Sequence, residues 1–343
     1  MKKIYLSFVV LMAGLLSGCD WLDNNDDKRS YMPQLPELQV SVYNGLEYEY
    51  NYDGTLDEIG LMDGYDGLDV DIDFSYTPFR IKEEYTYMDD IPFGVERFEY
   101  KNIRQNKYGY ITDLEVEYYY SDGEIEENEN MVMEFEYDDH YLTEFSFSTA
   151  GEGYDSTLDE EYRWSNDEHF TLKWKDFHIY EISNKYRWTE EGKHTYDQDN
   201  GSISYGILYS QMGNEYRQLM PAHFRVLYLD QFIPLLALAQ NSYFGAGPVS
   251  LPSKVQVYNH NIFSYNYVLN NDGSVLMVEE SNNEEVIGMH YFQYVTNQGR
   301  SEYVTLQQES MKPRPFHARR SKQCKRHEIE MSWKLLILKN CRG

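Results

Sequence analysis

The sequence predicts an all-β protein, an antiparallel meander of Tyr-rich hairpins that closes into a barrel-like sheet. Two observations support this fold class: apolar and polar residues alternate in short runs, and tight-turn residues separate the runs. Residues two apart lie on one face of a strand, and Asp-Gly or Asn-Asp-Gly supplies the positive φ angles of a tight turn. Such units recur at Tyr48–Ile59, Tyr118–Ile125, Glu134–Phe145, Tyr162–Trp174 and Phe263–Val278.

Length and composition fit one large β domain. The chain has 343 residues, 34 of them Tyr, and a formal net charge of -28. Tyr suits a half-buried pleated surface, because its ring packs while its hydroxyl stays hydrated. The negative charge excludes nucleic acid as a partner, since phosphate binding needs clustered Lys and Arg.

The first residues form a lipoprotein signal. Lys2 and Lys3 precede an apolar run, Ile4–Leu16, that is too short to cross a bilayer, and Leu16-Ser17-Gly18-Cys19 follows. The pattern predicts a signal peptide at 1–18, cut before Cys19, and attachment of acyl chains such as palmitate to that cysteine. Several acyl chains anchor a protein stably, so the membrane is the expected partner at this end.

A flexible spacer is expected between the anchor and the first strand. Residues 19–41 hold the lipidated cysteine and a segment, Asp20–Glu37, with no hydrophobic period. Its acidic start resembles the export signals of surface lipoproteins in the Bacteroidetes. The expected location is therefore the cell envelope, at the outer membrane, with exposure at the cell surface as an extension of that prediction.

The hairpin domain is predicted over 42–297, with one interruption. Pro221–Gln240 carries apolar residues at mixed spacings of three and four and contains Pro234. This pattern predicts two short helices, or one broken helix, packed on the sheet. The apolar run Phe232–Ala239 is too short for a membrane span.

Three motifs close the predicted domain: Leu251–Val255, Phe263–Tyr267 and Asp272–Val275. They resemble the closing signature of a Bacteroidetes lipoprotein family, the domain of unknown function 4595, and Tyr137-Asp138 with Leu142-Thr143 and Tyr162–Trp164 resemble the middle of that family. It covers about Val42 to Tyr294. It implies a porin-like fold and a tethered protein of unknown activity, and it carries over no functional residue.

The C-terminal segment, 298–343, differs from the rest of the chain in charge. From Gly299 onward it holds 11 Lys or Arg against 4 Asp or Glu, and Lys312–Arg326 contains seven basic residues and no acidic one. The hairpin pattern stops at the same place. We expect a basic, disordered tail, which is either a segment that docks on the acidic body or a reading-frame artefact.

Calcium is the one metal for which the sequence offers candidate ligands. Asp63, Asp66, Asp69, Asp71 and Asp73 lie within eleven residues, and carboxylate oxygens suit this hard cation. However, Phe74 stands where an EF-hand loop would have a glycine, and Asp69, Asp71 and Asp73 alternate with apolar residues as in a plain strand. The favoured interpretation is an acidic strand face without a cofactor, with calcium as the alternative.

No catalytic signature is present, so two function classes remain. The histidines lack zinc spacing, no serine lies in a nucleophile elbow, and no pair of carboxylates can be chosen from 58 acids. The favoured class is a tethered binding or scaffold module whose Trp164, Trp174 and Trp188 stack on a glycan or pack on a protein. The alternative is an extracytoplasmic glycan-directed hydrolase, although structural packing explains the same tryptophans more simply.

Overall fold

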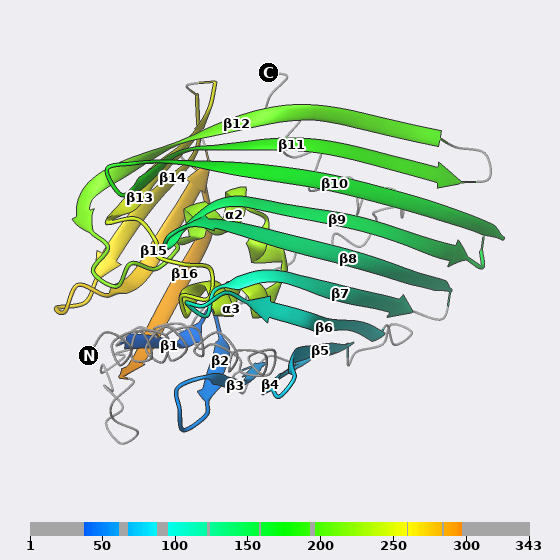
Figure 1. Cartoon of the computed structure of the whole chain (residues 1–343), viewed down its shortest axis with the longest axis horizontal. Helices are drawn as coiled ribbons and strands as arrows, with labels where there is room; N and C mark the ends of the chain where they lie inside the picture. The colour runs from blue at the N-terminus through cyan, green and yellow to red at the C-terminus, as the bar shows by residue number, and fades with distance from the viewer. Residues whose placement is uncertain are drawn as a thin grey trace, which may run out of the picture. The chain divides into compact units, whose positions relative to one another are not determined.

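The computed structural model describes residues 38–61, 68–87, 95–121, 124–157, 159–192, 196–258, 260–282 and 285–296. These residues form sixteen strands and one helical insertion (Figure 1). The predicted signal peptide, Cys19, the spacer before Leu38 and the basic tail lie outside the described residues. The strands are β1 (Leu38–Tyr43), β2 (Leu46–Tyr50), β3 (Leu56–Leu61), β4 (Leu68–Tyr76), β5 (Phe79–Tyr87), β6 (Val95–Gln105), β7 (Ile111–Ser121), β8 (Ile125–Asp138), β9 (Tyr141–Asp155), β10 (Glu160–Lys175), β11 (His178–Gly192), β12 (Tyr196–Gly213), β13 (Ser250–Val257), β14 (His260–Leu269), β15 (Val275–Asn282) and β16 (Glu285–Thr296).

The strands form a closed antiparallel barrel in simple chain order. Each strand pairs with its sequence neighbours, and β1 pairs with β16 to complete the ring. At this closure Leu38 lies opposite Thr296 and Tyr43 opposite Phe292. Closure removes the exposed strand edges that would otherwise template aggregation. The predicted meander that closes into a barrel is therefore confirmed, and its first strand begins before Val42.

Tight turns explain the hairpin spacing. Asn51-Tyr52-Asp53-Gly54-Thr55 and Asn270-Asn271-Asp272-Gly273-Ser274 adopt the same turn, with φ of 86° at both glycines. In each turn the Asp side chain accepts a hydrogen bond from the backbone N–H two residues later, at 3.0 Å in the first and 2.9 Å in the second. Glycine reaches this φ without steric cost, and Asp stabilises the turn locally.

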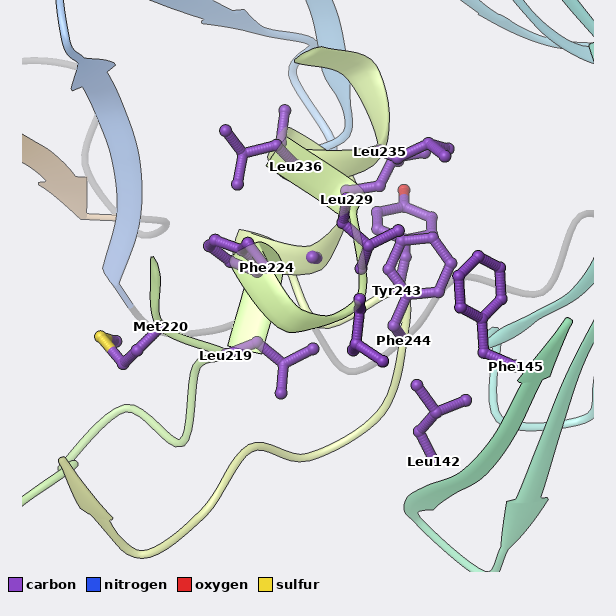
Figure 2. Close-up of a cluster of buried hydrophobic side chains, with 14 of the residues drawn as sticks. Leu142, Phe145, Leu219, Met220, Phe224, Leu229, Leu235, Leu236, Tyr243 and Phe244 are labelled. Carbon is purple, nitrogen blue, oxygen red and sulfur yellow. The ribbon is translucent and has the colours of Figure 1, made fainter. Parts of the chain in front are cut away.

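The helical insertion fills one end of the barrel. It consists of α2 (Pro221–Val226), the 3-10 helix η2 (Leu229–Gln231) and α3 (Ile233–Gln240), as the broken apolar period predicts. Its apolar residues belong to the same buried cluster as the inward side chains of the strands. In Figure 2, Leu142 and Phe145 point toward Tyr243 and Phe244, which follow α3. The side that faces the insertion is therefore the inside of the barrel.

The outward side of the strands is charged. On β5, Ile81 and Glu83 are buried, whereas Arg80, Lys82 and Glu84 alternate with them and are exposed. Across the same surface Arg97 pairs with Glu84 at 3.2 Å. A barrel wall in lipid has an apolar outward band, and each Lys or Arg on the lipid side at the midplane costs about 2–4 kcal/mol, with a smaller cost for Asp and Glu. This charged wall is unsuited to contact with hydrocarbon.

The helices of the described residues are all short. None of them combines the length and the apolarity of a transmembrane helix.

A buried ion pair attaches the insertion to the barrel wall. The carboxylate of Glu280 on β15, 2% exposed, lies 3.1 Å from a guanidinium nitrogen of Arg225 on α2 and accepts a hydrogen bond of 3.0 Å from the Tyr265 hydroxyl. His290 lies 3.4 Å from the same carboxylate. Burial alone would raise the pKa of Glu280, but the hydrogen bond with His290 and the charge of Arg225 lower it to about 2. The carboxylate is therefore charged at neutral pH and holds α2 in place.

Candidate binding surface

Half of the inner side of β8–β12 extends beyond the helical insertion. These strands are 14 to 18 residues long, and Figure 1 shows them running past α2 and α3. We call the inward positions of this half the acidic-aromatic face. It comprises Ile125, Glu127, Glu129, Thr149, Gly151, Gly153, Asp155, Glu160, Tyr162, Trp164, Asn166, Glu168, Asn184, Tyr186, Trp188, Glu190, Gly192, Asp197, Asp199 and Gly201, as the strand registers place them.

Three aromatic rings on this face lie directly against glycines of the neighbouring strand. Trp164 is opposite Gly151, Tyr162 is opposite Gly153, and Tyr186 is opposite Gly201. A Cβ atom built on these glycines would stand 2.2, 2.4 and 2.7 Å from the respective ring atoms. The rings can therefore lie close to the sheet only because no side chain is present beneath them.

The first two rings form a continuous platform. The ring centroids of Tyr162 and Trp164 are 5.7 Å apart and their planes differ by 26°. Both side chains are partly exposed. The Tyr162 hydroxyl donates a hydrogen bond to the Glu127 carboxylate on β8, which fixes the position of the phenol ring. A platform that is fixed in this way and backed by glycine can stack on a flat ligand with little loss of side-chain entropy.

Carboxylates surround the platform. Glu129 accepts a hydrogen bond from the Thr149 hydroxyl, and Glu168, which is buried, accepts hydrogen bonds from the side-chain amides of Asn166 and Asn184. Burial raises the pKa of the Tyr186 hydroxyl, and the neighbouring Asp199 carboxylate raises it further. The acidic-aromatic face therefore combines ring surfaces with hydrogen-bond acceptors.

The structure brings two of the three predicted tryptophans to this face. Trp164 on β10 lies opposite Glu190, and Trp188 on β11 lies opposite Asn166. Trp174 lies at the other end of β10. Its indole N–H donates a hydrogen bond of 2.7 Å to the Leu142 carbonyl oxygen, and its ring packs on Tyr141 with centroids 4.8 Å apart.

The five candidate calcium ligands are described only in part. Asp71 and Asp73 are exposed on the outward side of β4, where they lie opposite Glu84 and Lys82 of β5. Asp63 and Asp66 lie outside the described residues, as does the side chain of Asp69. Within the part of the chain that the structure describes, no group of three acidic, His or Cys side chains is arranged to hold a metal ion. Calcium binding by the full set stays a prediction.

Several residues of the acidic-aromatic face carry no sequence signal that marks them as part of a binding surface. Tyr162, Tyr186 and Glu190 look like any alternating strand residue, and Gly151 and Gly153 resemble loop glycines. Two local patterns do point to them in retrospect: Gly-x-Gly at 151–153 and Tyr-x-Trp at 162–164 have the same spacing of two. Only the β9–β10 register shows that each ring meets a glycine.

A separate titratable group lies inside the barrel on β5. Glu83, 2% exposed, accepts a hydrogen bond of 2.6 Å from the Tyr100 hydroxyl and another from the Tyr85 hydroxyl. Burial raises the pKa of its carboxyl to about 7, against the opposing effect of the two hydrogen bonds. The group is enclosed by tyrosines, so it bears on stability rather than on contact with a ligand.

Comparison with known proteins gives a weak similarity in structure and no match in sequence. No family model matches the chain, and no curated protein matches it. Among solved structures it is similar to a porin-like protein from Bacteroides uniformis ATCC 8492, with 11% sequence identity over 63% of this chain and 95% of that chain and a TM-score of 0.25. The chain itself is defined by its own architecture, a sixteen-stranded antiparallel barrel filled at one end by helices.

Proposed function

We propose that the protein is a cell-envelope lipoprotein, tethered through Cys19, whose barrel is a binding module for a glycan. Two aromatic rings that lie on glycines carry this proposal: Trp164 on Gly151 and Tyr162 on Gly153. Sugar rings present flat C–H surfaces that pack on aromatic faces, while their hydroxyl groups need hydrogen-bond acceptors. The acidic-aromatic face supplies both.

The charged outer wall supports a tethered barrel rather than one embedded in the bilayer. An anchor of several acyl chains holds a protein at the membrane without burying its surface in lipid. The Leu16–Cys19 box supplies such an anchor, and the resemblance to the Bacteroidetes lipoprotein family agrees with it. Attachment at the outer membrane and exposure at the cell surface belong to this proposal.

The anchor is tested by the substitution Cys19→Ala. We expect the variant to lose incorporation of labelled fatty acid and to leave the membrane fraction. A variant that still carries the label and sediments with membranes would show that the attachment lies elsewhere.

Binding is tested with a glycan array and with Asp20–Gly343 as the probe. We expect retention of one class of glycan by the native chain and its loss in Trp164→Ala, with the outward Tyr180→Ala as the matched control, because Tyr180 is an exposed aromatic residue of β11 on the opposite side. Analysis of the retained glycan for cleavage separates a binding module from the hydrolase alternative. Retention that is equal in all three proteins would refute a site on this face.

A further inference from the structure

Building on the proposed binding function, we propose that the glycan carries free amino groups, so that the acidic-aromatic face recognises an amino sugar as a cation. The inference rests on three features of the face: the distribution of charge across the two sides of the sheet, two buried oxygen atoms that lack donors, and the position of Glu190 beside the aromatic platform.

Charge is distributed differently on the two sides of the same strands. On the outward side, basic residues are present and some pair with carboxylates, as in Arg163–Glu152 and Lys173–Glu181. At the inward positions of the acidic-aromatic face there are eight carboxylates, and no Lys or Arg occupies any of these described positions. The carboxylates are Glu127, Glu129, Asp155, Glu160, Glu168, Glu190, Asp197 and Asp199.

Two of these carboxylates oppose each other directly. Glu190 on β11 lies in register with Asp197 on β12, and like charges at such a position destabilise a sheet. Glu190 is also in register with Trp164 on the other side, so a carboxylate stands next to the platform. A cation held over the ring would interact with the aromatic face and with the carboxylate together. The geometry therefore favours a ligand that supplies positive charge.

Two amide oxygens on the face point to the same kind of ligand. Asn166 and Asn184 both turn their Nδ2 groups toward Glu168, because a carboxylate accepts hydrogen bonds and cannot donate them. Their Oδ1 atoms are buried, and within the described residues neither accepts a hydrogen bond. Asn184 is 1% exposed. Of the two, Asn166 lies two residues from Trp164, whereas Asn184 lies six residues from Glu190. An ammonium group donates three hydrogen bonds and accepts none, so an ammonium group beside Trp164 matches the Oδ1 atom of Asn166 and the Glu190 carboxylate.

The stacking surface decides which class of cation fits best. A metal ion would use the carboxylates but not the glycine-backed rings, and a neutral sugar would use the rings but would leave the opposed carboxylates uncompensated. An amino sugar satisfies both, with its ring on Trp164 or Tyr162 and its ammonium group beside Glu190.

The test compares glucosamine oligomers with N-acetylglucosamine oligomers of the same length, in which an acetyl group on each nitrogen removes the positive charge of the amine. Binding is measured calorimetrically on Asp20–Gly343 at about pH 6, below the pKa of an ordinary amino group. We expect glucosamine oligomers to bind about tenfold more tightly or better, and the preference to weaken as salt is added. Glu190→Gln should reduce this preference severalfold, whereas the outward neighbour Glu191→Gln should leave it unchanged.

Each outcome decides between the two proposals. If both oligomers bind equally and Trp164→Ala abolishes both interactions, the glycan-binding function stands and the inference about the amine is wrong. If neither binds, and the array also shows no retention, both proposals fail. If a Lys-rich peptide of equal charge binds as tightly as the glucosamine oligomer, the face selects charge without a sugar ring and the inference is again wrong. A cooperative thermal transition of Glu190→Gln, with a midpoint at or above that of Glu191→Gln because the Glu190–Asp197 repulsion is removed, shows that the variant is folded.

Discussion

The two halves of β10 differ in role. The half beside the helical insertion stabilises the barrel, and the other half is available for binding. Near the insertion, Phe170 and Leu172 point inward and are fully buried against other strands and the helices. Further along the same strand, Trp164 and Tyr162 point inward on the same alternation but stay partly exposed. The inward alternation continues from one half to the other, so the difference in burial comes from the helices and strands that face each half. Stability and ligand binding should therefore respond to different substitutions.

The largest expected effect is at the helix-covered half. Phe170 packs on Phe145 with ring centroids 5.4 Å apart and on Tyr228 at 5.6 Å, so Phe170→Ala leaves a cavity. We expect a loss of about 3–5 kcal/mol in the free energy of unfolding. Trp164→Ala should cost much less, because its ring is partly exposed. Denaturant unfolding of both variants checks this contrast, and equal losses would show that the two halves do not differ in this way.

The second largest loss of stability is expected at the ion pair that attaches α2 to the barrel wall. Glu280→Gln removes a buried carboxylate from its pair with Arg225, which is partly exposed and keeps Asp230 at 3.4 Å, so we expect a cost of about 1.5–3 kcal/mol. Glu181→Gln breaks the exposed pair with Lys173 and should cost no more than about 1 kcal/mol. Because the folded pKa of Glu280 is lowered to about 2, its contribution is present above about pH 4.5 and is lost as the pH falls toward 2. Urea unfolding at pH 7 and pH 3 tests both statements.

In the other half, binding should change more than stability. Gly151→Ala places a Cβ within 2.2 Å of the Trp164 ring, so the ring must move off the sheet. We expect tenfold weaker glycan binding or worse, with a stability loss of about 1–3 kcal/mol from overpacking. Gly206→Ala is the control, because the nearest atom to its Cβ is 3.9 Å away. Unchanged binding in Gly151→Ala would show that the ring's position on the glycine is irrelevant to the ligand.

The smallest expected change in stability is at Glu83, and its size depends on pH. Its folded pKa is raised to about 7, so the folded state keeps a proton that the unfolded state releases, and stability falls as the pH rises from about 4.5 through 7. Glu83→Gln should reduce this slope and should be relatively more stable at pH 8, by on the order of 1–2 kcal/mol. Glu84→Gln, on the outward side, should keep the native slope. Identical slopes for the native chain and Glu83→Gln would contradict the raised pKa.

Much of the fold is predictable from local sequence, because strand alternation and turn chemistry act over a few residues. The Asp53-Gly54 and Asp272-Gly273 turns and the broken helix at Pro221–Gln240 are examples. The site is less predictable. Trp164 and Trp174 occupy one strand with similar neighbours, and only the distant insertion and the paired strands determine that Trp174 packs on Tyr141 while Trp164 covers Gly151. Such long-range registers depend on tertiary packing rather than on local propensity.

The closure between β1 and β16 has a consequence for how the chain folds. The hydrogen bond of 2.7 Å between the Tyr43 hydroxyl and His290 joins residues 247 positions apart, whereas the hairpins join neighbouring segments. Loop-closure entropy makes such a contact the most costly to form early, so hairpins should assemble first and the first and last strands should meet late. Until they meet, both edges can pair with another chain. The refolding yield should therefore fall as the protein concentration rises. This fall should be steepest for variants with substitutions in the β1–β16 pairing.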